Sequence, residues 1–171
     1  MISDQISNTE YNPYYTQYIN NACDIDIVKG LKENLERNLS FYSDIPEEKH
    51  NYAYAEGKWT IKQVLLHIID TERIFAYRAL RIARNDKTPL AGFEQDDYID
   101  NAITSVRSME SLLGEYESVR NASISLFESL NAEELKRVGV ASNSPISVRA
   151  IGYILTGHEN HHNRVIKQKY L

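Results

Sequence analysis

Apolar side chains recur every three or four residues in four long segments of this chain, and this spacing limits the possible folds most strongly. The segments span residues 24 or 26 to 42, about 60–84, 108–130, and 147 to near the C-terminal end. Such spacing places apolar side chains on one face of an α-helix. In the first segment the repeating residues are Ile27, Leu31, Leu35, Leu39 and Tyr42.

The second segment begins with the clearest helix signal. Thr60 and Gln63 fit a capping box, and Trp59 with Val64 fits a hydrophobic staple. No segment alternates convincingly between apolar and polar residues, as a half-buried strand does. Four long amphipathic helices within 171 residues therefore predict an all-α fold, a four-helix bundle, with residues 1–171 forming a single domain.

Three connecting segments carry further expectations. Residues 1–23 are polar and tyrosine-rich, and we expect them to pack on the bundle as a short helix or an irregular arm. Residues 85–104 form a long acidic loop between the second and third helices, with Pro89 and Gly92, and could serve as a lid because loops of this length are often functional. Residues 138–146 are expected to be a loop.

The net charge, the length of the apolar runs and the cysteine content limit the classes of partner and the compartment that we expect. The net charge of −5 argues against a nucleic-acid binder, which would present a basic face. No apolar run approaches the roughly 18 residues that a membrane span needs. Cys23 is the only cysteine, and the N-terminal residues lack the pattern of a signal peptide. We therefore expect a cytoplasmic protein with no nucleic-acid or membrane partner.

Two histidines stand where the fourth helix should be apolar. His158 and His162 lie four residues apart, which places both rings on one face, about one turn from each other. Imidazoles in a core are costly unless their nitrogens find partners, and one metal ion satisfies a nitrogen on each ring. The predicted inward face reads Val148, Ile151, Leu155, His158, His162, Val165 and Lys169.

His67 occupies a similar position on the second helix and would complete a set of three ligands. Three protein ligands leave coordination positions for water or substrate, as catalytic sites do. The alternative is that each histidine is an ordinary hydrogen-bonded core residue, which is the more common outcome for a single histidine such as His67. His50 lies in a polar loop and His161 is rotated about 100° from His162, so we expect both outside the ligand set.

Two motif matches suggest other metal sites. Residues 158–162 match H-E-x-x-H, the zinc-protease helix in which the glutamate is the general base. That class generally takes its third ligand downstream, where only nine residues remain. We therefore regard the match as accidental, although Glu159 could still line the site. The Glu-x-x-His pairs of a di-iron bundle are also present, but Glu47 and His50 follow Pro46 in a loop and cannot easily face a partner.

Two stretches of sequence resemble the DinB/YfiT-like superfamily. They are Lys58–Glu72, which contains the Trp-Thr-Ile…His run, and Gly157–His162, and their order and the chain length agree with the family. The resemblance implies an up-up-down-down type of four-helix bundle. It also implies that His67, His158 and His162 bind zinc, nickel or a similar divalent transition-metal ion.

The resemblance also suggests several functions. Some family members transfer thiols such as bacillithiol, mycothiol or glutathione, many are described as metal-dependent hydrolases, and many are dimers. We expect a metal-dependent enzyme that joins a small-molecule thiol to an electrophile. The alternatives are a hydrolase acting on a hydrolysable substrate and a non-catalytic stress-response protein with a structural metal. We also expect a homodimer. The catalytic residues remain open, and Asp70 and Glu72 are either partners of a ligand ring or solvated carboxylates.

Overall fold

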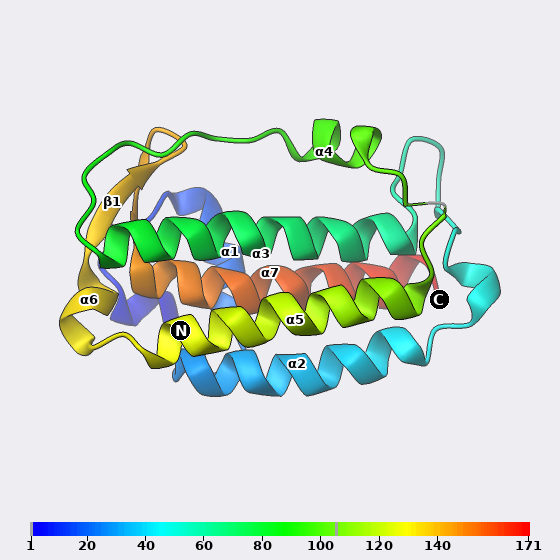
Figure 1. The fold of residues 1–171 in the computed structure, drawn as a ribbon, viewed down its shortest axis with the longest axis horizontal. Coiled ribbons are helices and arrows are strands. Elements are labelled where there is room, and N and C mark those ends of the chain that lie inside the picture. The colour runs from blue at the N-terminus through cyan, green and yellow to red at the C-terminus, as the bar shows by residue number, and fades with distance from the viewer. Residues whose placement is uncertain (1, 105) are drawn as a thin grey trace.

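The computed structural model describes residues 2–104 and 106–171, in which four long helices pack side by side (Figure 1). They are α2 (Ile27–Ser43), α3 (Ile61–Ala83), α5 (Met109–Glu128) and α7 (Val148–Lys169). This confirms the predicted all-α four-helix bundle. In the described part of the chain, no helix is both long and apolar enough to cross a membrane.

Each long helix begins at a side chain that caps it. Thr60 and Gln63 form the predicted capping box at α3, and Ser147 accepts a hydrogen bond from the Ala150 N–H at α7. Asp26 and Ser108 cap α2 and α5 in the same way. A capping side chain typically contributes about 1 kcal/mol to helix stability. These residues therefore set where each helix starts and, with it, which side chains face inward.

Helices α2 and α7 run in one direction, and α3 and α5 run in the other (Figure 1). Helix α2 packs against α5 and α3 packs against α7, and the two parallel helices of each pair are also neighbours. The order along the chain is thus up, down, down, up, which differs from the expected up-up-down-down order. The reason is the long connection between α3 and α5, which returns the chain along the bundle so that these two helices lie parallel.

Two apolar clusters fill the bundle, one toward each end. Leu31, Phe75, Phe127 and Ile151 belong to the first cluster. Tyr42, Leu65, Leu112 and Ile166 belong to the second. Between them lies a layer of fully buried polar side chains, with Arg120 at its centre. The core is therefore not uniformly apolar, and this polar layer adjoins the histidines described below.

The N-terminal arm contains two short 3₁₀ turns (Ile2–Gln5 and Pro13–Tyr15) and helix α1 (Thr16–Asn20). Helix α1 packs on α7, and Tyr11 and Tyr18 are buried. The contact is close because position 157 is a glycine. A Cβ atom there would lie 1.6 Å from the backbone oxygen of Tyr18. Only glycine therefore allows α1 to reach this surface, next to His158.

Replacing Gly157 with alanine should displace the arm. We expect a loss of about 3 kcal/mol in the free energy of unfolding, because the added methyl group meets backbone atoms that cannot move independently. Denaturant unfolding measures this loss, and limited proteolysis should show faster cleavage within residues 2–26. Gly114→Ala on α5 is the matched control, since no atom lies within 4 Å of its added Cβ. It should stabilise the protein by about 0.5–1 kcal/mol.

A second anchor of the arm is an ion pair. The Glu10 carboxylate accepts hydrogen bonds from Arg149 and, at 3.0 Å, from the Ser7 N–H. Burial alone would raise the pKa of Glu10, but these hydrogen bonds lower it overall. A carboxyl with a lowered folded-state pKa stabilises the protein above its unfolded pKa, and this contribution disappears as the pH falls through the folded pKa.

Glu10→Gln should therefore cost about 1–2 kcal/mol at pH 7 and less near pH 3, because the stabilisation by the ionised carboxylate declines as Glu10 takes up a proton. Urea unfolding of both proteins across this range measures the difference. An equal cost at both pH values would show that the ion pair does not hold the arm.

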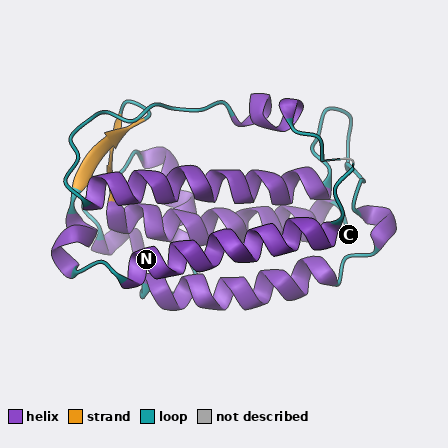
Figure 2. Cartoon of the chain, in the orientation of Figure 1, coloured by secondary structure: helices purple, strands orange, loops and turns teal. Residues whose placement is uncertain are grey.

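The predicted loop at 138–146 is instead a β-hairpin, formed by β1 (Val138–Ala141) and β2 (Ser144–Ser147) at one end of the bundle (Figure 2). The prediction was wrong because the turn signal is weak. Ser142 and Asn143 both adopt positive φ, 50° and 59°, as a two-residue hairpin turn of type I′ requires. Asn-Gly or Asp-Gly would have marked such a turn more clearly.

The 85–104 segment is also more structured than predicted. It contains helix α4 (Gln95–Asn101), whose first turn carries Asp96 and Asp97, and acidic residues favour the N-terminal end of a helix. Ile99 anchors α4 and is 1% exposed. Upstream, Leu90 exchanges backbone hydrogen bonds with Val140 and Ser142 of the hairpin. The segment thus crosses the bundle as a strap that is attached at both ends.

Candidate metal centre

His67, His158 and His162 meet between α3 and α7. The Nε2 atom of His158 lies 3.1 Å from that of His67 and 3.0 Å from that of His162. One ligand atom from each ring lies within 4.8 Å of the others, so this group can hold a metal ion. Nitrogens bound to one ion at about 2.0–2.1 Å in tetrahedral geometry are about 3.3 Å apart. The observed separations fit that arrangement.

Neighbouring rings fix the orientation of the histidines. The Trp59 ring lies 4.7 Å from the His67 ring, and the Tyr18 ring lies 5.4 Å from the His158 ring, centroid to centroid. Trp59 precedes the Thr60 cap of α3, and Tyr18 belongs to α1. The arm and the start of α3 therefore contribute directly to the site, which sequence patterns on the two histidine helices alone do not reveal.

The predicted inward face of α7 is correct only in its first half. Val148, Ile151 and Leu155 are buried, but Lys169 is exposed. The reason is that steps of three and four residues average 3.5, whereas a straight helix has 3.6 residues per turn, so the predicted stripe drifts around the helix. The buried line continues instead at Glu159, Asn163, Ile166 and Tyr170. His158 and His162 lie at its edge and are half-buried, with access to solvent.

The environment keeps the three imidazoles neutral at neutral pH. Burial lowers the pKa of His67 to about 4. Burial, together with the neighbouring histidines, lowers the pKa of His162 to about 3 and that of His158 well below its ordinary value. Metal ions bind neutral imidazole, so the ligands need not lose a proton before binding. Three neutral rings with convergent nitrogens are the donor set that zinc and similar ions accept.

The other two histidines lie outside this group. The His50 Nε2 atom is 2.9 Å from the backbone oxygen of Ile45, which indicates a structural role. His161 is half-buried, and its ring packs 5.3 Å from that of His162 and 5.5 Å from that of Tyr18. Neither belongs to the set of convergent nitrogens.

The three acidic candidates do not reach the histidines. Glu159 is fully buried on α7 and pairs with Arg120, so it does not line the site. Glu72 is 2% exposed and also pairs with Arg120, so it is neither a ring partner nor a solvated carboxylate. Asp70 is half-buried, 3.8 Å from Arg73, and burial raises its pKa.

Sequence reasoning missed the buried polar network behind the histidines. Arg120 of α5 donates to Glu72 of α3 at 2.8 Å and to Glu159 of α7 at 2.7 Å. Glu159 also accepts from Tyr116 at 2.6 Å and from Asn34 at 2.7 Å. The sequence did contain an indication that Arg120 is buried. It follows Tyr116 by four residues and so lies on the apolar face of its helix.

This network fixes the histidine helices relative to each other. Glu72 lies five residues from His67 on α3, and Glu159 directly follows His158 on α7. Both carboxylates bind the same guanidinium. Removing one partner of a buried ion pair is strongly destabilising, so the network favours one relative position of α3 and α7. The separation of the histidine nitrogens depends on that position.

Cavities open on both sides of the histidines. One, of about 240 Å³, is lined by His67 and His158 together with Tyr15, Tyr18 and Phe75. The other, of about 730 Å³, is lined by His162 with Trp59, Lys58 and His161. Asp96 of α4 lines both cavities. The strap therefore passes over the site without closing it.

The fold and the site together define a class of protein, a four-helix bundle with three convergent histidines on two of its long helices. Residues 31–166 match the sequence pattern of the DinB superfamily, and the chain belongs to that superfamily.

Two relatives illustrate the similarity. Over 127 residues, which are 73% of this chain and 72% of the relative, the chain is 29% identical to “Putative metal-dependent hydrolase OB0413” of Oceanobacillus iheyensis. The fold is similar to that of YfiT from Bacillus subtilis, with a TM-score of 0.70 and 15% identity, covering 93% of this chain and 91% of that one. YfiT is described as “a probable metal-dependent hydrolase with an unusual four-helix bundle topology”.

Proposed function

We propose that this protein is a metal-dependent enzyme in which His67, His158 and His162 hold one divalent ion, zinc or nickel. The observation that carries the proposal is the convergence of three neutral Nε2 atoms, 3.0–3.1 Å from one to the next, between two cavities. Among the residues that the structure describes, no carboxylate joins this group. A structural zinc site usually closes with four protein ligands, so the three-histidine set favours a catalytic role over the structural alternative.

The reaction that we propose is transfer of a low-molecular-weight thiol to an electrophile. A divalent ion in such a site supplies Lewis acidity and lowers the pKa of a nucleophile. The chain itself supplies three oriented imidazoles, aromatic walls that limit water, and two separate spaces. The space beside His67 and the space beside His162 would suit a reaction between two organic substrates.

Hydrolysis is the second candidate. Its support is the naming of the Oceanobacillus iheyensis relative as a metal-dependent hydrolase. For a hydrolase, one cavity would bind the substrate and the nucleophile would be water. The two candidates share the metal and differ in the second reactant, so an assay can separate them.

Metal-loaded protein, purified without an affinity tag, should accelerate conjugation of monochlorobimane with bacillithiol or glutathione. The metal-stripped protein and the His158→Ala variant should not, because both lack the bound ion. Fluorescence of the conjugate measures the rate. No acceleration with any thiol, together with turnover of an ester or amide, would assign a hydrolase. No turnover of either kind would support a non-catalytic role.

A further inference from the structure

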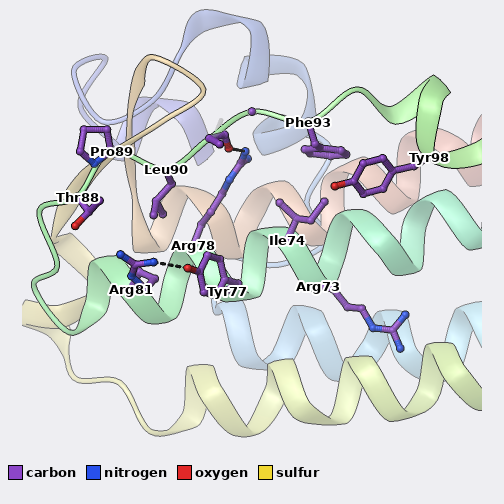
Figure 3. Close-up of a pocket in the computed structure, with 12 residues that line it drawn as sticks. Arg73, Ile74, Tyr77, Arg78, Arg81, Thr88, Pro89, Leu90, Phe93 and Tyr98 are labelled. Carbon is purple, nitrogen blue, oxygen red and sulfur yellow. Dashed lines mark hydrogen bonds between the residues drawn. The ribbon is translucent and has the colours of Figure 1, made fainter.

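Arg78 is a buried cation at the junction of two cavities. It lies on α3, on the same face as His67 and three turns beyond it, and is 2% exposed. The smaller cavity beside His67 and His158 includes Arg78 in its wall. So does a second cavity of about 500 Å³ beneath residues 88–93 of the strap, where Figure 3 shows the Arg78 side chain extending from α3 between Leu90 and Phe93.

The charge of Arg78 is not matched by an acid. Its Nη2 atom donates to the Ala91 backbone oxygen at 2.7 Å and to Ser142 Oγ at 3.1 Å, and both are neutral acceptors. Within the described part of the chain, Arg78 forms no ion pair, and neither Nε nor Nη1 donates a hydrogen bond. The other buried arginine, Arg120, pairs with two carboxylates. A buried guanidinium ordinarily requires such a partner.

Aromatic rings hold the guanidinium in place. Its central carbon lies 5.0 Å from the Phe75 ring centroid and 5.7 Å from that of Phe93. The hydrogen bonds to Ala91 and Ser142 fix the remaining side. Arg78 is therefore oriented before any ligand arrives, with donors still available in a cavity whose wall also contains two of the three histidines. A planar cation with free donors recognises carboxylates especially well.

We propose that Arg78 binds the carboxylate of a small organic acid whose other end lies against His67 and His158. This names the substrate class of the proposed enzyme and rests on that function only for the role of the histidines. The cavity of about 240 Å³ fits a small molecule, and Phe75 with Tyr15 offers an apolar wall for its body. The ligand supplies the negative charge that the chain does not.

Two acids also line this cavity and must be compatible with an anion. Glu94 and Asp96 are exposed residues of the strap and the start of α4. Neither forms an ion pair with Arg78 in the described residues. Water and salt screen exposed charges strongly and buried ones much less. We therefore expect the buried Arg78 to act on a bound anion more strongly than these two exposed acids do.

Benzoate and benzamide test the proposal, because they share a ring and differ in charge. Isothermal titration should show that the protein binds benzoate at least tenfold more tightly than benzamide. Arg78→Gln should abolish this preference, and Arg78→Lys should retain part of it. A charge-assisted hydrogen bond is worth about 10- to 100-fold in affinity. Arg84→Gln removes the same charge from an exposed pair with Glu134 and should bind benzoate normally.

Arg78 also attaches the strap, so each variant needs circular dichroism and a melting temperature beside the titration. If Arg78→Gln does not fold, the preference of the unmodified protein for benzoate over benzamide decides the question. Equal binding of the two probes, or full benzoate affinity in folded Arg78→Gln, would overturn the proposal. Titration of the metal-stripped protein separates the two hypotheses. A protein that prefers benzoate but binds no metal would support the anion site and contradict the proposed metal-dependent enzyme. A protein that binds metal but shows no benzoate preference would support the enzyme and contradict the anion site.

Discussion

His67→Ala, His158→Ala and His162→Ala should each lose most of the bound metal while the helical bundle stays folded. Each substitution removes one of three bonds to the ion, so affinity should fall steeply. The vacated space borders a cavity and can take up water, which should hold the stability cost near the low end of the roughly 2–5 kcal/mol for large-to-small changes in a core. Metal analysis by mass spectrometry and circular dichroism measure the two effects.

The two remaining histidines are internal controls. His50→Ala and His161→Ala should retain the metal, because neither ring contributes to the convergent nitrogens. His161 is the stricter control, since its ring packs against His162 without joining the set. Loss of metal in His161→Ala but not in His162→Ala would show that the orientation of α7 is wrong. Normal metal content in all five variants would show that the histidines are ordinary core residues.

Arg120→Met should cause the largest loss of stability of any single substitution considered for this bundle. It leaves the Glu72 and Glu159 carboxylates buried without a cation, and breaking a buried ion pair in this way costs roughly 3–5 kcal/mol. Urea unfolding measures the loss. Metal affinity should fall as well, because the network that fixes α3 against α7 is gone.

Two comparisons identify the cause. Arg84→Met removes an exposed partner of Glu134 and should cost no more than about 1 kcal/mol. Glu72→Gln and Glu159→Gln, added to Arg120→Met, remove the remaining charges and should recover part of the lost stability. If the triple variant is as unstable as Arg120→Met alone, lost packing rather than unpaired charge is responsible.

The fold could be predicted because its signals are local. The Thr60 capping box, the Ser147 cap and the apolar spacing each concern residues within a few turns, and the four long helices were found close to their expected ends. The hairpin was not predicted because its turn lacks strong turn residues. Ser142 and Asn143 adopt positive φ, and the backbone of Ser142 is held by a hydrogen bond to Leu90 of the strap. The strap helix α4 depends similarly on burial of Ile99 by distant residues.

At the site, spacing placed His158 and His162 on one face of a helix, and the structure brings His67 to them. The partners of the site were harder to predict. Arg120 donates hydrogen bonds to Glu72 and Glu159, which lie 48 and 39 residues away in sequence. Tyr18 reaches His158 only because Gly157 admits the arm. A single sequence gives little indication of contacts between distant segments, whereas helical spacing can be recognised from residues in adjacent turns.

The central claim is that three histidines hold one ion with a position left for a reactant. Anomalous diffraction from a crystal of zinc-loaded protein tests it most directly. We predict one anomalous peak per chain, about 2.0–2.1 Å from the Nε2 atoms of His67, His158 and His162, with solvent at a further position. No peak between these rings, or a peak closed by a fourth protein ligand, would contradict the claim.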